Sequence, residues 1–448
     1  MNPTQPKLKL KQKSNSHRAA GGSSPPQSLI TTMAKITLLT LFPVLAAWSW
    51  SWSYSRASTN PDPFAGISIP RQSVVSSSQT FLQFTATPHI LYYTTQVINP
   101  LSFTVLGPSP TPFRTSSITQ FFNPTNTTPP FFQIFHPSFL SILGPSPSIR
   151  SIASNPGFAF AHEAPVWDER TDEVFLRVMM VREIAKSPSN QVRDVNVTVT
   201  KLDLPDSIQM TNGGTGPFKG ALLLVNSGRA NIPPSLALVD PQNPSNTTVV
   251  LDNFFGRQFN SLNDAKIHPG SGKIFFTDVP YGFLNNFRFD PLMPNQVYRF
   301  DPDTGNVRVV ADGIVRPNGI AFSQDGNTAF VTDTATVGGF LGNNQTLPAT
   351  IYAFDVDPQT QAFKNKRVFA YTDTGIPDGI QLDSEGNVYS GCGDGVHVWN
   401  PEGTLIGKFF LGSLSANMAF AGKGRLVIMA ETNVYLAEIA AGGINLAF

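Results

Sequence analysis

The chain contains very little cysteine, since Cys392 is the only one among its 448 residues. A single cysteine cannot form an intramolecular disulfide, and disulfides are the usual sign of an oxidising compartment. Cysteine usage therefore does not indicate the compartment in which the protein works, and other parts of the sequence must do so.

Acidic residues are almost absent from the first third of the chain. Asp62 is the only one before Glu163, whereas the other 29 of the 30 acidic residues lie from Glu163 onward. The net charge is nevertheless only +1, and the body of the chain has no basic cluster, so nucleic acid is not expected as a partner. The change in composition at Glu163 marks the main boundary in the sequence.

The apolar stretch from Ile36 to Trp48 has only 13 residues. This length is typical of the apolar segment of a secretory signal peptide and is short for a membrane span. If translation starts at Met33, the segment is an ordinary secretory signal. If it starts at Met1, the long stretch before the apolar segment would allow the segment to remain as an anchor. We expect a secreted protein, with a membrane-anchored protein of the secretory pathway as the alternative if residues 36–48 stay uncleaved.

Four glycosylation sequons agree with secretion, and they begin at Asn126, Asn196, Asn246 and Asn344. Such triplets also occur by chance, so they support a secreted glycoprotein only mildly. The expectation of secretion therefore depends mainly on the signal-like segment.

Composition divides the chain into four parts. Residues 1–32 form a basic extension that cannot bury a core and is expected to be disordered. Residues 33–55 hold the signal peptide or anchor, and residues 56–130 are rich in Ser, Pro and Phe without clear periodicity, so no structure is assigned to them. Residues 131–448 are predicted to form the folded domain.

Helical patterns are almost absent from residues 131–448, which excludes a TIM barrel or a Rossmann fold. A weak repeat is present instead, as in "LNDAKIHPGSGKIFFTDV", "PNGIAFSQDGNTAFVTDT" and "PDGIQLDSEGNVYSGCGDG". Each unit predicts four antiparallel strands joined by hairpins. The third strands end near Asp240, Asp301, Asp355 and Asn400, at a period of roughly 45–60 residues. Six such units predict an all-β fold, a six-bladed β-propeller, with seven blades as the nearest rival.

In a propeller the innermost strands line a central channel, so residues at the starts of these strands converge on one axis. Glutamate, asparagine and aspartate recur at this position, beside a small residue, in four of the six units. The residues are Glu163, Asn263, Asn318 and Asp378, with Lys219 and Asn417 in the two remaining blades. The repeat therefore predicts that these polar side chains cluster at one mouth of the channel.

Two carboxylates and two carboxamides at one channel mouth require a counter-ion. A single Asn-Gly or Asp-Gly pair normally only makes a turn, but several in register across a repeat are better explained by a shared site. Hard oxygen donors favour Ca²⁺, with Mn²⁺, Mg²⁺ and Zn²⁺ as alternatives, although Zn²⁺ prefers nitrogen or sulfur. We therefore expect a central metal site with Glu163, Asn318, Asp378 and Asn263 as its candidate ligands, with a contact of Asn263 to the substrate as the alternative.

The motifs at these strand starts resemble those of a known family. "EAPVW", "ND", "RPNGIAFSQDGNTAFVTDT" and "PDGIQLDSEGNVY" are similar to the motifs of the senescence-marker-protein/gluconolactonase/luciferin-regenerating-enzyme-like family. The stretch "SFLSILGPSPSIRSIASNPGFAFAHEAPVWDERTDEVF" is more similar to fungal-type lactonohydrolases. The resemblance covers about residues 131–448, and Pro165 is a departure from its pattern that touches no ligand.

The resemblance implies a six-bladed propeller with one catalytic divalent metal, usually Ca²⁺, on its axis. It implies Glu163, Asn318 and Asp378 as metal ligands, and a contact of Asn263 with either metal or substrate. It further implies a metal-dependent lactonase that opens a small-molecule lactone of the sugar (aldono-) type.

In such a mechanism the metal would bind the lactone carbonyl oxygen and lower the pKa of a bound water. Asp378 is predicted as the general base that aligns this water. His162 and Asp264 are second choices, because neighbours in a strand alternate faces and should point away from the ion. Asn263 and Lys219 are predicted to bind the sugar hydroxyls of the substrate.

Two alternative functions stay open. The same metal site could serve a hydrolase of organophosphates or aryl esters, or the propeller could bind calcium without catalysing a reaction. A serine esterase is not favoured, because the chain has no Gly-x-Ser-x-Gly motif. Substrate specificity is expected in loops such as Tyr281–Pro294 and Val337–Leu347.

Overall fold

The structure, a computed structural model, describes residues 95–104, 113–177, 191–193 and 198–444. The basic extension, the signal-like segment and the sequon at Asn196 lie outside these residues. No helix within the described ranges is long and apolar enough to cross a membrane.

Blades two, three and four are each built from consecutive strands in which all neighbours are antiparallel, as the hairpin pattern predicts. Blade two contains β8 (Thr211–Phe218), β9 (Ala221–Asn226), β10 (Ser235–Val239) and β11 (Thr247–Leu251). Blade three contains β14 (Leu262–Ile267), β15 (Ile274–Asp278), β16 (Gln296–Phe300) and β17 (Val307–Ala311). Blade four contains β18 (Pro317–Phe322), β19 (Thr328–Asp333), β20 (Thr350–Val356) and β21 (Phe363–Tyr371). A small hairpin of β12 (Asn253–Phe254) and β13 (Arg257–Gln258) precedes blade three.

Blade five is extended outward by two strands from the preceding part of the chain. Its own strands are β22 (Ile380–Leu382), β23 (Val388–Cys392), β24 (Gly395–Trp399) and β25 (Leu405–Phe410). Antiparallel to β25 lies β2 (Phe131–Ile134), and parallel to β2 lies β1 (Thr95–Val97). The segment around residues 95–134 thus takes part in the sheet.

Blade six closes the ring with a strand from the other end of the domain. It contains β26 (Asn417–Phe420), β27 (Lys423–Ala430) and β28 (Asn433–Gly442), with β3 (Ser148–Ser154) paired antiparallel to β28 as the outermost strand. The first and last parts of the propeller are therefore joined by backbone hydrogen bonds within one sheet.

Blade one differs from the four antiparallel strands predicted for every unit. Its order is β4 (Glu163–Asp168), β5 (Glu173–Arg177), β7 (Thr198–Lys201) and β6 (Gln191–Arg193). The chain forms β6 at the sheet edge before it returns as β7 between β5 and β6, and β7 consequently runs parallel to β5. A hairpin pattern in the sequence does not reveal that the edge strand precedes its inner neighbour along the chain.

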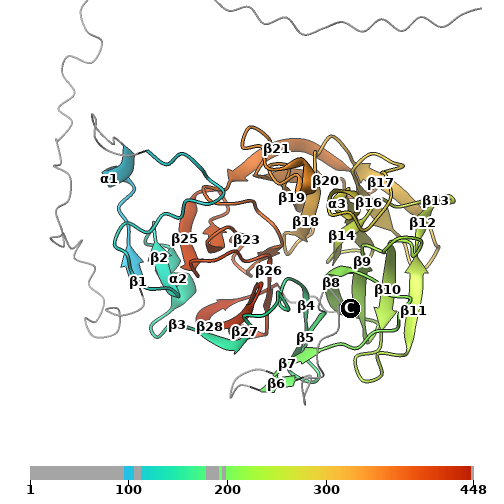
Figure 1. Cartoon of the computed structure of the whole chain (residues 1–448), viewed down its shortest axis with the longest axis horizontal. Helices are drawn as coiled ribbons and strands as arrows, with labels where there is room; N and C mark the ends of the chain where they lie inside the picture. Colours follow the sequence, from blue (N-terminus) through green and yellow to red (C-terminus); the bar gives the residue numbers. More distant parts are fainter. Residues whose placement is uncertain (1–94, 105–112, 178–190, 194–197, 445–448) are drawn as a thin grey trace, which may run out of the picture. The chain divides into compact units, whose positions relative to one another are not determined.

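The six innermost strands, β4, β8, β14, β18, β22 and β26, surround the axis of the propeller (Figure 1), which confirms the predicted fold. Apolar side chains fill the space between adjacent blades, as where Phe275 and Val297 of blade three pack with Ile320, Phe322 and Val331 of blade four. Because this burial links each blade to the next, the ring itself is the core of the domain.

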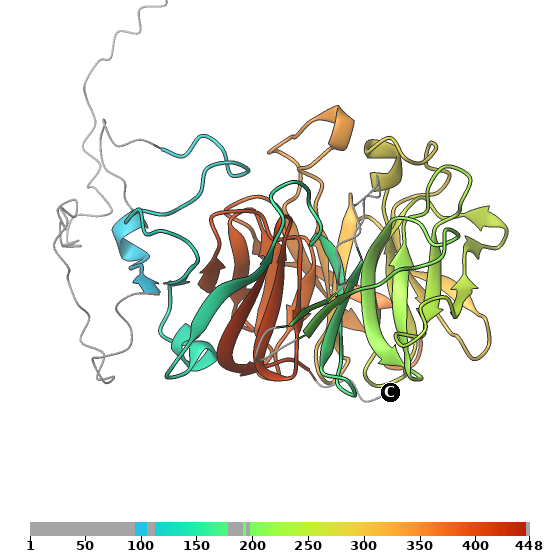
Figure 2. The same ribbon diagram turned by 60° about the horizontal axis from the view of Figure 1, so that its bottom comes forward.

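Helical elements within the described residues are short. They are α1 (Leu101–Thr104), α2 (Phe139–Leu143), α3 (Tyr281–Leu284) and the 3₁₀ turn η1 (Gly339–Leu341). Figure 2 shows α3, in olive, and η1, in orange, rising from the same end of the ring. The loops that carry them follow β15 and β19, whose last residues Asp278 and Asp333 pair with the starts of β14 and β18. These loops therefore stand at the end of the channel where the innermost strands begin.

Candidate metal centre

Four of the predicted site residues lie where an innermost strand begins. Glu163 opens β4, Asn263 and Asn318 are the second residues of β14 and β18, and Asp378 lies two residues before β22. All four are buried, with 3 to 9% of their surface exposed. The repeat thus brings them to one end of the channel from four different blades.

Hydroxyl groups from the neighbouring blade hold the backbone of these residues in place. Thr277 Oγ1 of blade three donates to the Asn318 carbonyl oxygen at 2.6 Å, and Thr332 Oγ1 of blade four donates to the Asp378 carbonyl oxygen at 3.0 Å. In blade two, Ser227 Oγ donates to the Leu262 carbonyl oxygen at 2.7 Å. A hydroxyl-to-carbonyl hydrogen bond from the preceding blade therefore orients the starts of three successive innermost strands.

The glycines after Asn318 and Asp378 serve close approach between blades, and neither has a positive φ. A Cβ atom on Gly319 would lie 2.5 Å from the Asp378 carbonyl oxygen, and one on Gly379 would lie 2.4 Å from the side chain of Asn417. Asn318 and Gly319 lie within β18, so this Asn-Gly pair is part of a strand and does not form a turn. Only glycine leaves room for the strand starts to converge.

Two side-chain oxygens in this group, one from an amide and one from a carboxylate, lack a hydrogen-bond partner among the described residues. Asn318 Oδ1 and Asp378 Oδ1 are buried and have no hydrogen bond within the described part of the chain. One ligand atom each from His162, Glu163 and Asp378 lies within 4.8 Å of the others. Buried acceptors without a donor are costly, at about 1–3 kcal/mol each, and a cation would satisfy them. The donor set therefore fits a divalent metal ion.

The electrostatics of the group support the same interpretation. Burial raises the pKa of Asp378 to about 6, with His162 opposing this effect and Glu431 adding to it. Burial also raises the pKa of Glu163 well above its usual value, and the charge of Asp378 raises it further. Both carboxylates are thus destabilised in their charged form, which is the condition that a bound cation would reverse.

The expectation that His162 points away from the site is wrong. Its ring lies beside Glu163 and Asp378, and its Nδ1 is 2.6 Å from Glu431 Oε1. His162 precedes β4, and Ala164 has a φ of 61°, so the alternation of an extended strand does not apply at this point. Burial alone would lower the pKa of His162, but the hydrogen bond and charge of Glu431 outweigh it and raise the pKa.

Lys219, predicted to bind substrate, is not brought to this group. It lies in the turn that follows β8, and its Nζ is 2.9 Å from Asp303 Oδ1 in the turn after β16. Both turns are at the end of their blades away from the candidate ligands, because β8 begins at the ligand end with Thr211 and Asn212. The predicted alignment used the first hairpin of blade two and missed its innermost strand, which contains the sequence TNGGTGPF.

Asn212 takes the place that was predicted for Lys219. Its Nδ2 donates to the Asn263 carbonyl oxygen at 3.2 Å, so it contacts the start of the neighbouring strand. Asp264, the next residue, has both oxygens in use: Oδ1 accepts from the Ala265 backbone N–H and Oδ2 from that of Ile320. Asp264 thus joins blades three and four through backbone hydrogen bonds.

Sequence reasoning missed the role of three further residues. Glu431, in the turn between β27 and β28, orients His162, and Asn417 Nδ2 donates to Glu163 Oε2 at 2.6 Å. Tyr281 of α3 is near enough to Asp378 for the charge of that carboxylate to add to the effect of burial in raising its pKa. Asn417 stood in register with the ligands and could have been found, whereas Glu431 and Tyr281 lie in loops without a recurring position.

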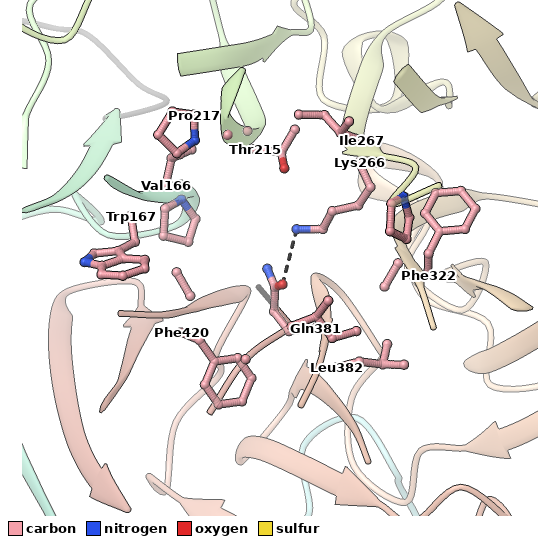
Figure 3. Close-up of a pocket in the computed structure, with 18 of the residues that line it drawn as sticks. Val166, Trp167, Thr215, Pro217, Lys266, Ile267, Phe322, Gln381, Leu382 and Phe420 are labelled. Carbon is pink, nitrogen blue, oxygen red and sulfur yellow. Dashed lines mark hydrogen bonds between the residues drawn. The ribbon is translucent and has the colours of Figure 1, made fainter. Parts of the chain in front are cut away.

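A cavity of about 140 Å³ lies farther along the channel, lined by residues from all six innermost strands (Figure 3). Lys266 of β14 reaches across it to Gln381 of β22, with 3.3 Å between Nζ and Oε1. None of the predicted ligand residues lines this cavity. The candidate ligand residues and the cavity therefore occupy different levels of the same channel.

Comparison with known proteins agrees with this architecture. A family model described as the SMP-30/Gluconolactonase/LRE-like region matches residues 161–431. The lactonohydrolase oryL of Aspergillus oryzae is 31% identical over 307 residues, which cover 64% of this chain and 68% of that protein. The gluconolactonase of Zymomonas mobilis is 31% identical over 199 residues, which cover 42% of this chain and 52% of that protein.

Among solved structures, the gluconolactonase XC5397 from Xanthomonas campestris has the same fold. It aligns with a TM-score of 0.56 at 24% identity and covers 68% of this chain and 94% of its own. At this identity the likeness concerns the fold alone, but the family match spans more than half of the chain and includes Glu163, Asn263, Asn318 and Asp378. The chain therefore belongs to the SMP-30/gluconolactonase/LRE-like family.

Proposed function

We propose that the protein is a metal-dependent lactonase that opens a sugar-type (aldono-) lactone. The observation that carries this proposal is the pair of buried, unpartnered oxygens of Asn318 and Asp378, next to Glu163 at the mouth of the channel. Relatives named lactonohydrolase and gluconolactonase support the reaction class.

Glu163, Asn318 and Asp378 would hold the metal, with Asn263 at its side or facing the substrate. We propose Ca²⁺, because carboxylate and carboxamide oxygens are the ligands it prefers, with Mn²⁺ and Mg²⁺ as alternatives. A divalent ion bound there supplies Lewis-acid polarisation of a carbonyl group and acidification of water.

Asp378 is the group that we propose as the general base. A carboxylate has two oxygens, so one oxygen of Asp378 can contact the ion while the other accepts a proton from water. His162 is held by Glu431 next to the same carboxylate and keeps its imidazole oriented toward it. Asn417 holds the second carboxylate, Glu163, through its amide group.

The loops that carry α3 and η1 are proposed as the walls of the substrate site. The rings of Phe283 and Phe340 meet edge to face with their centroids 5.2 Å apart, so the two loops support each other. Phe340 and Leu341 remain 51% and 66% exposed at this end of the channel. Variation in these apolar side chains would select among lactones of different size.

The proposal is tested by measuring acid release from a panel of aldonolactones before and after dialysis against EDTA, and again after Ca²⁺ is restored. Asp378→Asn should lower kcat on the order of 10³-fold, since a general base and a ligand are lost together. The same variant should be at least as stable as the wild-type apoprotein, because a repelling buried charge is removed.

The matched control is Asp312→Asn, an exposed aspartate between β17 and β18. Retention of full activity after chelation, or in Asp378→Asn, would overturn the mechanism. Turnover of phosphotriesters or aryl esters without any lactone hydrolysis would replace the proposed substrate class.

We also propose that the protein is secreted and glycosylated. The sequon asparagines Asn126, Asn246 and Asn344 are all exposed, as glycan attachment requires. Amino-terminal sequencing of the protein from a eukaryotic secretion host should find a start after the segment 33–55, and enzymatic removal of N-glycans should lower its mass.

A further inference from the structure

The residues before the propeller include a segment that contacts the metal-centre end of the ring. Residues 113–120 connect the part of the chain near α1 with β2 and run beside blade five (Figure 1). Two loops meet this segment: residues 334–349, which join β19 to β20, and residues 372–379, which join β21 to β22 and contain Asp378. Its contacts therefore fall on the loops that flank the candidate ligands.

Arg114 binds the second of these loops through both terminal nitrogens of its guanidinium group. Nη2 donates to the carbonyl oxygen of Asp373 at 2.7 Å and to Thr374 Oγ1 at 3.1 Å, and Nη1 lies 3.2 Å from Asp373 Oδ2. Nη2 also donates to the Gln120 carbonyl oxygen at 2.8 Å, which closes the segment on itself. One side chain thus fixes both the backbone and the side chains at the start of the loop.

Ser117 joins the two loops to each other. Its carbonyl oxygen accepts from the Gly375 backbone N–H at 2.5 Å. Its own N–H and hydroxyl both donate to Gln345 Oε1, at 2.8 and 3.1 Å. The segment therefore connects the loop of blade four, next to Asn318, with the loop of blade five that holds Asp378.

Asp373 has a second anchor that does not depend on Arg114. The ammonium group of Lys408, which is fully buried, lies 2.8 Å from Asp373 Oδ1 and 2.9 Å from Asp394 Oδ2. His397 Nε2 lies 2.5 Å from Asp394 Oδ1 and completes the group. Because these residues belong to blade five, Arg114 can be removed without leaving a buried charge unpaired.

Only two residues separate Gly375 from Asp378, so a restraint at residues 373–375 acts directly on the position of the carboxylate. We propose that Arg114 and Ser117 are positioning residues, which hold the two loops together and thereby keep Asp378 in register with Asn318 and Glu163. This inference rests on the proposed lactonase function for its catalytic consequence, whereas its structural consequence can be measured without any substrate.

The test compares Arg114→Ala, Arg114→Lys and Gln345→Ala in the full chain, with Arg367→Ala as matched control. Arg367 also pairs with an aspartate, Asp355, at 2.7 Å, but on the outermost strand of blade four. In Arg114→Ala and Gln345→Ala, amide hydrogen exchange in residues 372–379 should become on the order of tenfold faster. In the same variants kcat on an aldonolactone should fall by about tenfold, with a smaller change in KM, because the base is misplaced more than the substrate.

Arg114→Lys should fall between Arg114→Ala and wild type in both measurements, since an ammonium group pairs with Asp373 Oδ2 but cannot reach all the acceptors of the guanidinium fork. The control should match wild type. Unchanged exchange in residues 372–379 of Arg114→Ala, or equal effects in Arg367→Ala, would overturn the proposal. If the wild type hydrolyses no lactone while the exchange result is as expected, the proposed function fails and the positioning role stands.

Discussion

At the scale of single residues, the candidate site consists of groups that are unfavourable without a partner. Asn318 and Asp378 each present a buried oxygen that no described residue satisfies. Burial raises the pKa of both Glu163 and Asp378, and the charge of Asp378 raises that of Glu163 further. Such arrangements lower the stability of the free protein and are found where a ligand supplies what is missing.

Metal affinity should therefore increase with pH. The pKa of Asp378 is raised to about 6 and that of Glu163 lies well above its usual value, so both carboxyls bind protons that a cation must displace. The association constant for Ca²⁺ should rise up to about tenfold per pH unit for each proton released, through pH 6 and above, and level off once both groups are ionised.

Calorimetric titration between pH 5 and 8, in two buffers of different ionisation enthalpy, measures both the affinity and the protons released. The same pKa shifts also make the stability of the apoprotein depend on pH. Because the pKa of Asp378 is higher in the folded than in the unfolded state, the apoprotein is more stable in acid, and this contribution is lost as pH rises through about 6. An affinity for Ca²⁺ that does not vary over this range would contradict the assignment of the ligands.

At the scale of secondary structure, the strands that complete blades from outside their own repeat are the least predictable elements. β3 closes blade six, β2 and β1 extend blade five, and β6 forms before β7 in blade one. β1, β2 and β6 have only three or four residues each, and β3 has the largely polar sequence SIRSIAS. Nothing local specifies the partner of any of these strands. Long-range packing selects it: Ile149 of β3 pairs with Ala437 of β28 and belongs to the same core cluster as Ile428 of β27.

Ile149→Ala should consequently lower the free energy of unfolding by about 2–4 kcal/mol, because it removes buried methyl groups where the ring closes. The matched control is Val249→Ala on β11, the outermost strand of blade two, where the side chain is 45% exposed and the expected change is below about 0.5 kcal/mol. Urea unfolding followed by tryptophan fluorescence measures both. Equal effects in the two variants would show that β3 does not contribute to closure in the way the structure indicates.

At the scale of the whole molecule, the candidate metal site connects blades that are far apart in the sequence. Glu163 belongs to blade one, Asn318 to blade four and Asp378 to blade five, so an ion held by all three links opposite sides of the ring. A ligand that binds only the folded ring stabilises it against unfolding.

Calcium should therefore raise the free energy of unfolding by about 2.7 kcal/mol when its free concentration is 100 times the dissociation constant. Thermal unfolding at several calcium concentrations, with excess EDTA as reference, measures the effect. Asp378→Asn should show no calcium-dependent shift, and a shift of equal size in that variant would place the bound ion elsewhere on the molecule.

The periodic strands and turns of the sequence determined the six-bladed propeller, because each repeat carries local hairpin signals that need no distant information. They also brought Glu163, Asn318 and Asp378 into register, since the start of an innermost strand is a position that every repeat shares. The placement of Lys219 failed in blade two, where the innermost strand TNGGTGPF has little apolar character and the repeat could not be aligned.

Only the tertiary structure decided the rest of the site. His162 is drawn toward Asp378 by a backbone that leaves the extended conformation at Ala164 and by Glu431 from blade six, and neither cause is visible in a strand pattern. The contacts of Arg114 join residues more than 250 positions apart in the chain. Hydrogen bonds between loops depend on where the folded ring places those loops, whereas the ring depends mainly on the pattern within each repeat.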